Sequence, residues 1–186
     1  MMRRMPYISC ALTLLLAAAA AQATTLRRMS LDELTADSGV VARVRCMASE
    51  SRWEGGRIWT FTTFEVIETL KGRAPSTIRV RLIGGRAGSL TSRVEGVPRF
   101  RAGEETFVFL APAAQGDWTV TGWVLGTFRL TRDKRTGQEA VTQDTAGLTL
   151  FDPITRRFEP GGVRQMPLDD FRGRVRRAVS RRGASQ

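Results

Sequence analysis

The sequence predicts a mainly β protein: a small β-barrel with a short N-terminal helix and a C-terminal amphipathic helix. Short segments of alternating apolar and polar residues, separated by turn residues, indicate strands. The longest segment, residues 57–72, is rich in aromatic, β-branched and threonine residues, which favour a half-buried sheet. Near the C-terminus, apolar residues recur at helical spacing instead.

The first 23 residues have the three parts of a secretory signal peptide. Arg3 and Arg4 precede an apolar run from Ile8 to Ala21, and Ala21-Gln22-Ala23 is a small-residue cleavage site. The alternative is a membrane anchor, but the run is shorter than the roughly 20 residues of a spanning helix. We therefore expect cleavage near Ala23 and export to the periplasm or the cell exterior.

We expect four segments along the chain. They are a signal peptide (1–23), an N-terminal segment with a short helix (24–39), a β-barrel domain (40–152), and a linker with a basic C-terminal helix and tail (153–186). In the second segment, Ser30 and Glu33 have the spacing of a capping box, which predicts a helix from Leu31 to Ala36.

The first half of the barrel reads as three strands. Residues 40–47 alternate as a strand with one buried and one wet face, residues 51–56 form a turn, and residues 57–72 form a long strand covered on both sides in part. Residues 77–83 form the third strand, in which Arg79 and Arg81 lie on the outward face.

The second half begins with the longest irregular stretch, residues 84–98, which is the natural place for a binding loop. An apolar strand for the barrel interior follows at 106–110. Further strands are predicted at 118–120, 123–130, 139–143 and 148–151, with a bend at Gly122 and a hairpin turn at 134–138.

Beyond Gly161-Gly162, four apolar residues form one stripe of a helix: Leu168, Phe171, Val175 and Val179. This helix should dock its stripe on the barrel, and the tail from Arg181 should be loose.

Removal of the signal peptide would take Cys10 and leave Cys46 as the only cysteine, so no internal disulfide is expected. Its place in an apolar strand favours a buried thiol. The tryptophans divide by position: Trp59 and Trp123 lie inside strands and are expected in the core, whereas Trp53 and Trp118 flank turns and are candidates for exposure.

The chain is basic, with a net charge of +11, and 27 of its 29 basic residues are arginine. Such a surface can bind polyanions without sequence preference. The competing interpretation is that the arginines are compositional and only solvate the surface.

The chain contains no histidine, which excludes Ser-His and Cys-His nucleophile pairs and histidine-containing zinc sites. It also lacks the Walker and dinucleotide-binding motifs. We therefore expect no cofactor, no metal site and no catalytic residue. A hydrolase that uses two carboxylates from distant segments stays open as an alternative.

The succession VVARVRCMASESRW, TFTTFEVIETLKG, STIRVRLIGG and PRFRAGEETFVFLAP resembles a group of exported bacterial proteins of unassigned role. More distantly, it is similar to the OB-like barrel of netrin-type and tissue-inhibitor-of-metalloproteinase modules. The similar part runs from about Val40 to Leu130. The resemblance implies a five- or six-stranded OB-like (Greek-key) β-barrel used as a binding module. The inhibitors chelate zinc through an N-terminal cysteine, whereas the predicted first residue here is Thr24.

Together these features predict an exported, non-catalytic binding module, with a protein as its partner. An anionic polysaccharide or lipid headgroup is the alternative ligand, and nucleic acid is not expected. The predicted binding residues are the arginines of, and next to, the 84–98 loop: Arg79, Arg81, Arg86, Arg93 and Arg99.

Overall fold

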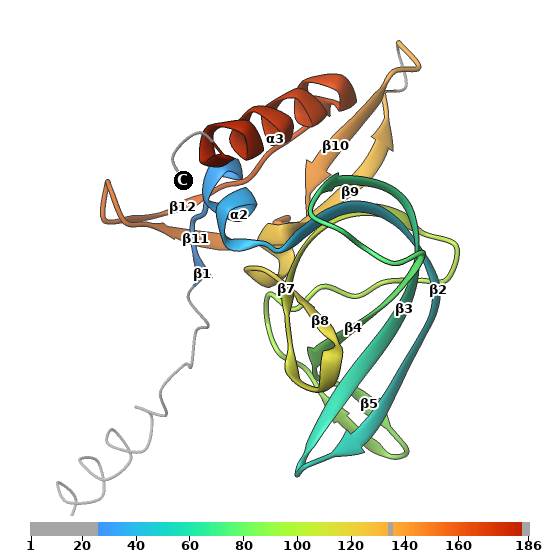
Figure 1. The fold of residues 1–186 in the computed structure, drawn as a ribbon. Coiled ribbons are helices and arrows are strands. Elements are labelled where there is room, and N and C mark those ends of the chain that lie inside the picture. Colours follow the sequence, from blue (N-terminus) through green and yellow to red (C-terminus); the bar gives the residue numbers. More distant parts are fainter. Residues whose placement is uncertain (1–25, 134–135, 184–186) are drawn as a thin grey trace, which may run out of the picture.

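Strands are the main secondary structure in the computed structural model, which describes residues 26–133 and 136–183 (Figure 1). The predicted signal peptide lies outside these residues. The two α-helices are α2 (Leu31–Asp37) and α3 (Leu168–Gly183), and short 3₁₀ turns lie at η1 (Ala114–Gly116) and η2 (Trp123–Gly126). The strands are β1 (Leu26–Arg27), β2 (Val40–Glu54), β3 (Arg57–Lys71), β4 (Thr77–Ile83), β5 (Gly85–Ala87), β6 (Leu90–Ser92), β7 (Glu105–Pro112), β8 (Trp118–Val120), β9 (Thr127–Arg132), β10 (Glu139–Gln143), β11 (Thr149–Asp152), β12 (Arg157–Pro160) and β13 (Met166–Pro167).

Five of the strands close a ring. Their order is β7-β2-β3-β4-β8, and β8 pairs back onto β7. The pairs are antiparallel except β4 with β8, which meet in parallel at Val80 and Trp118. Strands β9, β10 and β13 extend the same sheet beyond the ring on the β7 side, and β1, β11 and β12 form a separate small sheet.

The long hairpin of β2 and β3 is the largest part of the ring. The strand predicted at 57–72 is confirmed as β3. The strand predicted at 40–47 continues to Glu54, so the predicted turn at 51–56 shrinks to Gly55 and Gly56. Both glycines have positive φ (58° and 79°), as a two-residue hairpin turn requires. The serine-rich second half of β2 was not predicted as a strand, because its side-chain partners lie on β3. Ser49 and Ser51 of β2 pair there with threonines of β3.

The first core fills the inside of the ring. Its buried members are Val40, Ala42, Val44, Cys46, Phe64, Ile78, Val80, Leu82, Phe100, Val108, Leu110 and Val120. Cys46 is buried, as predicted, and burial raises the pKa of its thiol.

A second core lies outside the ring, where the sheet meets the two helices. Its buried members are Leu34, Val41, Phe107, Phe109, Leu125, Phe128, Val141, Leu150, Leu168, Phe171 and Val175. Strand β7 was expected to be an interior strand, but it serves both cores: Val108 and Leu110 point into the ring, whereas Phe107 and Phe109 pack on Phe171 of α3. A strand covered on both faces reads as a continuous apolar run.

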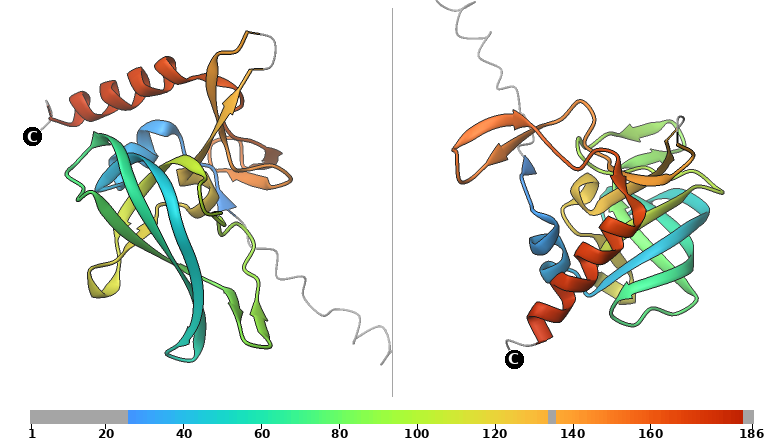
Figure 2. Two further views of the ribbon diagram at one scale, coloured as in Figure 1. Left: turned by 90° about the vertical axis from the view of Figure 1, so that its right-hand side faces the viewer. Right: turned by 90° about the horizontal axis from the view of Figure 1, so that it is seen from above.

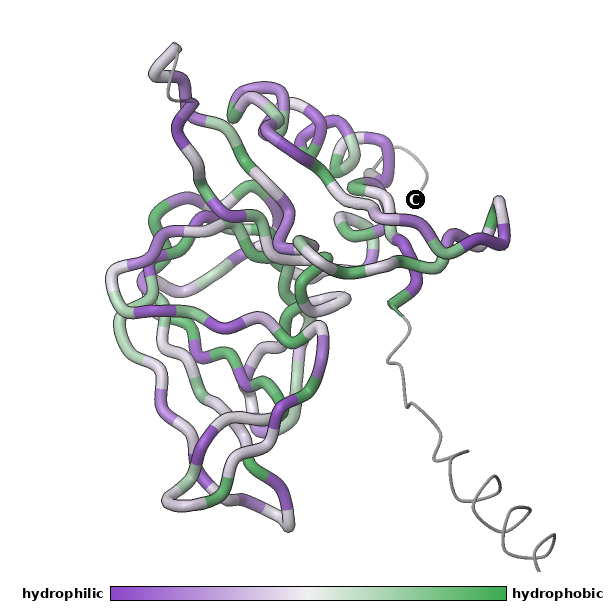
Figure 3. Tube along the Cα trace, turned by 180° about the vertical axis from the view of Figure 1, so that it is seen from behind, coloured by the Kyte–Doolittle hydropathy of each residue, from purple (hydrophilic) through white to green (hydrophobic). Residues whose placement is uncertain are grey.

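Both helices lie on this second core, side by side at one end of the ring (Figure 2). The predicted capping box is confirmed: Ser30 Oγ accepts a hydrogen bond from the Glu33 amide, and Glu33 Oε2 accepts one from the Ser30 amide. The remaining faces of α3 are hydrophilic (Figure 3). The loose tail predicted from Arg181 is wrong, because α3 continues to Gly183 and Arg181 donates to Asp32 at 2.8 Å.

Three predicted irregular or extended stretches differ from the structure. The 84–98 stretch contains the β5–β6 hairpin, and the 153–167 linker contains β12 and β13. The strand predicted at 123–130 begins only at Thr127, because Gly122 (φ 61°) turns the chain into η2 first.

Candidate functional site

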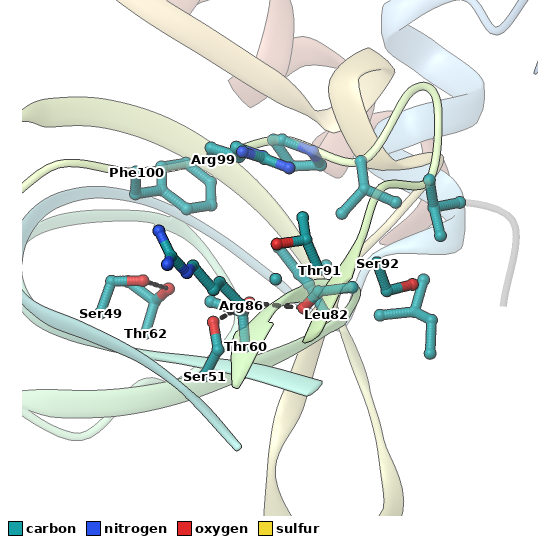
Figure 4. A pocket seen from close by; sticks show the side chains of 16 residues that line it. Ser49, Ser51, Thr60, Thr62, Leu82, Arg86, Thr91, Ser92, Arg99 and Phe100 are labelled. Atoms are coloured by element: carbon teal, nitrogen blue, oxygen red, sulfur yellow. Dashed lines mark hydrogen bonds between the residues drawn. The ribbon is translucent and has the colours of Figure 1, made fainter. Parts of the chain in front are cut away.

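A pocket of about 470 Å³ lies between the inner face of the β2–β3–β4 sheet and the segment from Gly84 to Phe100 (Figure 4). The strands supply its floor, and the β5–β6 hairpin with the following loop supplies its walls. The residues that line it are Ser49, Ser51, Thr60, Thr62, Leu82, Ile83, Gly84, Gly85, Arg86, Thr91, Ser92, Val94, Val97, Pro98, Arg99 and Phe100. Leu82 and Phe100 also belong to the first core, so the pocket sits directly on it.

Two cross-strand pairs of hydroxyls form the polar floor. Ser51 Oγ lies 2.8 Å from Thr60 Oγ1, and Ser49 Oγ lies 3.0 Å from Thr62 Oγ1. Thr60 donates its only hydroxyl proton to the Gly84 carbonyl at 2.6 Å, so Ser51 must be the donor to Thr60. The Ser49–Thr62 pair uses one proton between them and keeps the other free. The floor can therefore donate one hydrogen bond to a ligand and accept others.

Gly85 lets the hairpin approach these hydroxyls. A Cβ at this position would lie 2.2 Å from Ser51 Oγ and 2.4 Å from Thr60 Oγ1, and the φ of Gly85 is +128°. No other residue type fits there without movement of the hairpin or the floor. The close approach is what makes β5 a wall of the pocket.

Arg86 and Arg99 supply the charge of the pocket. In the view of Figure 4, Arg86 reaches between the Ser49–Thr62 pair and the ring of Phe100, and Arg99 lies at the far rim. Arg86 Nε donates to the Gly88 carbonyl at 3.2 Å. In the described part of the chain, neither guanidinium has a carboxylate partner, and no Asp or Glu lines the pocket. The site is therefore electropositive and lacks an internal counter-charge.

A cluster behind the pocket holds Arg99 and Phe100 in place. Arg129 lies between Glu104 and Asp144 and donates to both carboxylates. The same guanidinium donates to the Arg99 carbonyl at 2.8 Å and lies 5.1 Å from the Phe100 ring centroid. The charge of Arg129 is thus compensated, and its role is to position the pocket wall.

Of the five arginines predicted to bind, the structure brings only Arg86 and Arg99 together in the pocket. Arg93 is exposed but does not line it. Arg79 and Arg81 lie on the opposite face of the sheet, since Val80 and Leu82 point inward. Arg79 pairs with the buried Asp117, whose hydrogen bond raises the pKa of Arg79.

Arg81 lies on the outward face of the strand, as predicted, but other side chains cover it. Only 8% of it is exposed, because its guanidinium stacks on the Trp59 ring at 4.2 Å and lies near Phe61. The Arg52 guanidinium lies over the Phe61 ring, 3.9 Å from its centroid. These arginines bury aromatic rings on an outward face, which is a packing role. Trp59 is therefore half-buried beneath arginine rather than part of either core, whereas Trp53 is 57% exposed.

The sequence reasoning missed the hydroxyl floor and Gly85. The available signal was the pair of alternating small polar residues, Ser49 with Ser51 and Thr60 with Thr62, at positions where apolar inner residues are expected. Only the β2–β3 register shows that the two pairs face each other.

The carboxylates that converge elsewhere are held by arginine. Glu65 and Glu105 both accept hydrogen bonds from Arg45, and the bond from Arg45 lowers the pKa of Glu105 most. Among residues 26–133 and 136–183, no group of three or more potential ligands is placed to hold a metal ion.

No family model matches the sequence, and no curated protein is significantly similar to it. Within the described ranges, neither helix has the length and apolar character needed to cross a membrane.

Proposed function

We propose that the protein is an exported, non-catalytic binding module whose ring of strands is an OB-like barrel, and whose pocket receives an anionic group of a partner protein. A carboxylate of an acidic side chain or of a chain terminus has the required chemistry. Arg86 and Arg99 support this function most strongly, because they face one pocket without a counter-charge in its lining.

The chemistry of the lining matches a carboxylate. A guanidinium forms two parallel hydrogen bonds with a carboxylate, and charge-assisted bonds of this kind are each worth about 1.5–3 kcal/mol. The free proton of the Ser49–Thr62 pair offers a further donor. The pocket volume, about 470 Å³, accommodates a side chain or a short chain end, while the rest of a partner stays outside.

Comparative capture from the producing cell's envelope fraction tests this function. The baits are the wild-type protein, the Arg86→Ala/Arg99→Ala variant, and an Arg73→Ala/Arg157→Ala control that removes the same charge from two exposed arginines away from the pocket. We expect a protein that the wild type and control retain and the pocket variant loses, measured by quantitative mass spectrometry. Retention of the same set by all three baits would contradict the proposal.

The face of α3 beside the start of α2 supports a second candidate, polyanion binding. Arg174 and Arg177 are exposed there, and neither has an ion-pair partner in the described part of the chain. If α3 binds polyanions, affinity for a heparin oligosaccharide should fall steeply with salt and should drop in an Arg174→Ala/Arg177→Ala variant. Equal binding by this variant and the Arg73→Ala/Arg157→Ala control would contradict it.

A further inference from the structure

A second, more apolar groove opens next to the pocket. It also has a volume of about 470 Å³ and lies between the ends of the β2–β3 and β5–β6 hairpins. Its lining residues are Trp53, Gly56, Arg57, Ile58, Ile83, Leu90, Thr91 and Ser92. Trp53 and Leu90, on its opposite sides, are 57% and 56% exposed.

Trp53 continues the row of inner-face residues that forms the pocket floor. Ser49, Ser51 and Trp53 alternate along β2, and Trp53 pairs with Ile58 of β3 in the regular part of the register. The hairpins project beyond the ring, away from α3 (Figure 1), so the ring does not cover Trp53. An uncovered tryptophan facing an uncovered leucine is typical of a contact surface.

The groove and the pocket are continuous. Ile83, Thr91 and Ser92 line both of them. A ligand that fills the pocket therefore passes next to Trp53 and Leu90 where it leaves the pocket on this side. Charge and apolar surface lie in a fixed order along the path, with the guanidinium groups inside and the apolar pair outside.

From this arrangement, and resting on the function proposed above, we infer that the ligand is an extended acidic peptide segment with a large apolar side chain close to its carboxylate. The carboxylate lies in the pocket with Arg86 and Arg99. The apolar side chain lies in the groove between Trp53 and Leu90. The second contact gives the site selectivity that a bare anion site lacks.

A peptide fits this surface better than a bilayer does. The hairpin turns themselves are Gly55-Gly56 and Gly88-Ser89, so the apolar side chains face across the groove and do not project from the tips.

Four kinds of synthetic peptide on a glycine–serine background test the inference. They carry a glutamate and a leucine at several spacings, the glutamate alone, the leucine alone, or neither, and fluorescence anisotropy measures their affinity for the purified full chain. We expect the peptide with both glutamate and leucine, in at least one spacing, to bind at least ten-fold more tightly than the peptide with glutamate alone. If none of the peptides with both glutamate and leucine binds, the inference is overturned.

Variants separate this inference from the proposed function. Trp53→Ala and Leu90→Ala should lower the affinity for the peptide that carries both glutamate and leucine to that for the glutamate peptide. Ile154→Ala, at a 91% exposed site, should leave both affinities unchanged. Arg86→Ala/Arg99→Ala should weaken both acidic peptides. Unchanged binding by the Trp53 and Leu90 variants overturns the inference alone, and unchanged binding by the arginine variant overturns the proposed function.

A vesicle-binding experiment tests whether a lipid surface occupies the groove instead of a peptide. We expect no binding of phosphatidylglycerol vesicles that depends on Trp53 and Leu90. Vesicle binding that both substitutions abolish, with no binding of any peptide, would assign the groove to a lipid surface and overturn the peptide.

Discussion

The Thr60 hydroxyl donates a 2.6 Å hydrogen bond to the Gly84 carbonyl and thereby joins the floor of the pocket to the start of its wall. Thr60 belongs to β3, and Gly84 lies between β4 and β5. The same hydroxyl accepts from Ser51 of β2. One side chain thus ties together the segments that shape the candidate site.

Thr60→Val should lower the free energy of unfolding by about 1–3 kcal/mol, because it leaves the Gly84 carbonyl without its donor. Urea unfolding measures the change. Thr63→Val, on the opposite face of the same strand, is the matched control, since no side-chain hydrogen bond of Thr63 is seen in the described part of the chain. Equal losses of unfolding free energy in both variants would show that the Thr60 hydroxyl does not stabilise the pocket wall.

Gly85→Ala should cost more stability than Gly88→Ala. Both glycines have positive φ, so each alanine carries a conformational cost of about 1 kcal/mol. Only at Gly85 does the added Cβ collide with Ser51 and Thr60, whereas at Gly88 nothing lies within 4 Å. The difference between their thermal unfolding midpoints measures the collision, and no difference would mean that the hairpin moves away freely.

Small anions should stabilise the protein through the pocket. An anion at a concentration equal to its Kd adds about 0.4 kcal/mol to the free energy of unfolding. We expect inorganic phosphate to raise Tm more for the wild type than for Arg86→Ala/Arg99→Ala, with chloride at matched ionic strength as the reference. General salt effects raise the Tm of both proteins equally. An equal rise would therefore place anion binding outside the pocket.

Phe171→Ala should lower the free energy of unfolding by about 3–5 kcal/mol, because it opens a cavity in the second core. The Phe171 ring is fully buried and contacts the rings of Phe107 and Phe128, with centroids 5.0 Å away in each case. Phe158→Ala, at a 59% exposed site, should cost much less. Denaturant unfolding of the two variants tests whether α3 is part of the folded unit.

Acid should destabilise the protein in part through Glu105. Hydrogen bonds from Arg45 and Arg43 hold the pKa of Glu105 below its ordinary value of 4.5 in the folded state. Its stabilising contribution is therefore fully present above that value and is lost as the pH falls through the lower, folded pKa.

Glu105→Gln should flatten the decline of unfolding free energy below about pH 4.5, the ordinary value of this carboxyl. Glu139→Gln, an exposed site without an ion pair in the described part of the chain, should leave the decline unchanged. Unfolding measured across this pH range compares the two variants. Parallel curves would remove Glu105 from the acid response.

Local patterns in the sequence were enough to predict several elements. The aromatic and threonine alternation predicted β3, the Ser30–Glu33 spacing predicted the start of α2, and the stripe of Leu168, Phe171 and Val175 predicted the buried face of α3. Each depends on residues close together in the chain, where spacing directly determines which side chains share a face. The mainly β character of the chain followed from the same patterns.

The candidate site depended on contacts that no local pattern contains. Arg81 and Arg86 are both arginines near the same loop, yet one stacks on an aromatic ring and the other reaches into the pocket. Burial and charge compensation are set by partners far away in sequence, such as Trp59 for Arg81. By itself, the sequence determined the longer strands, the two helices and the lack of histidine chemistry. Only the tertiary structure decided which arginines meet in one cavity, because strand register and ring closure place their side chains.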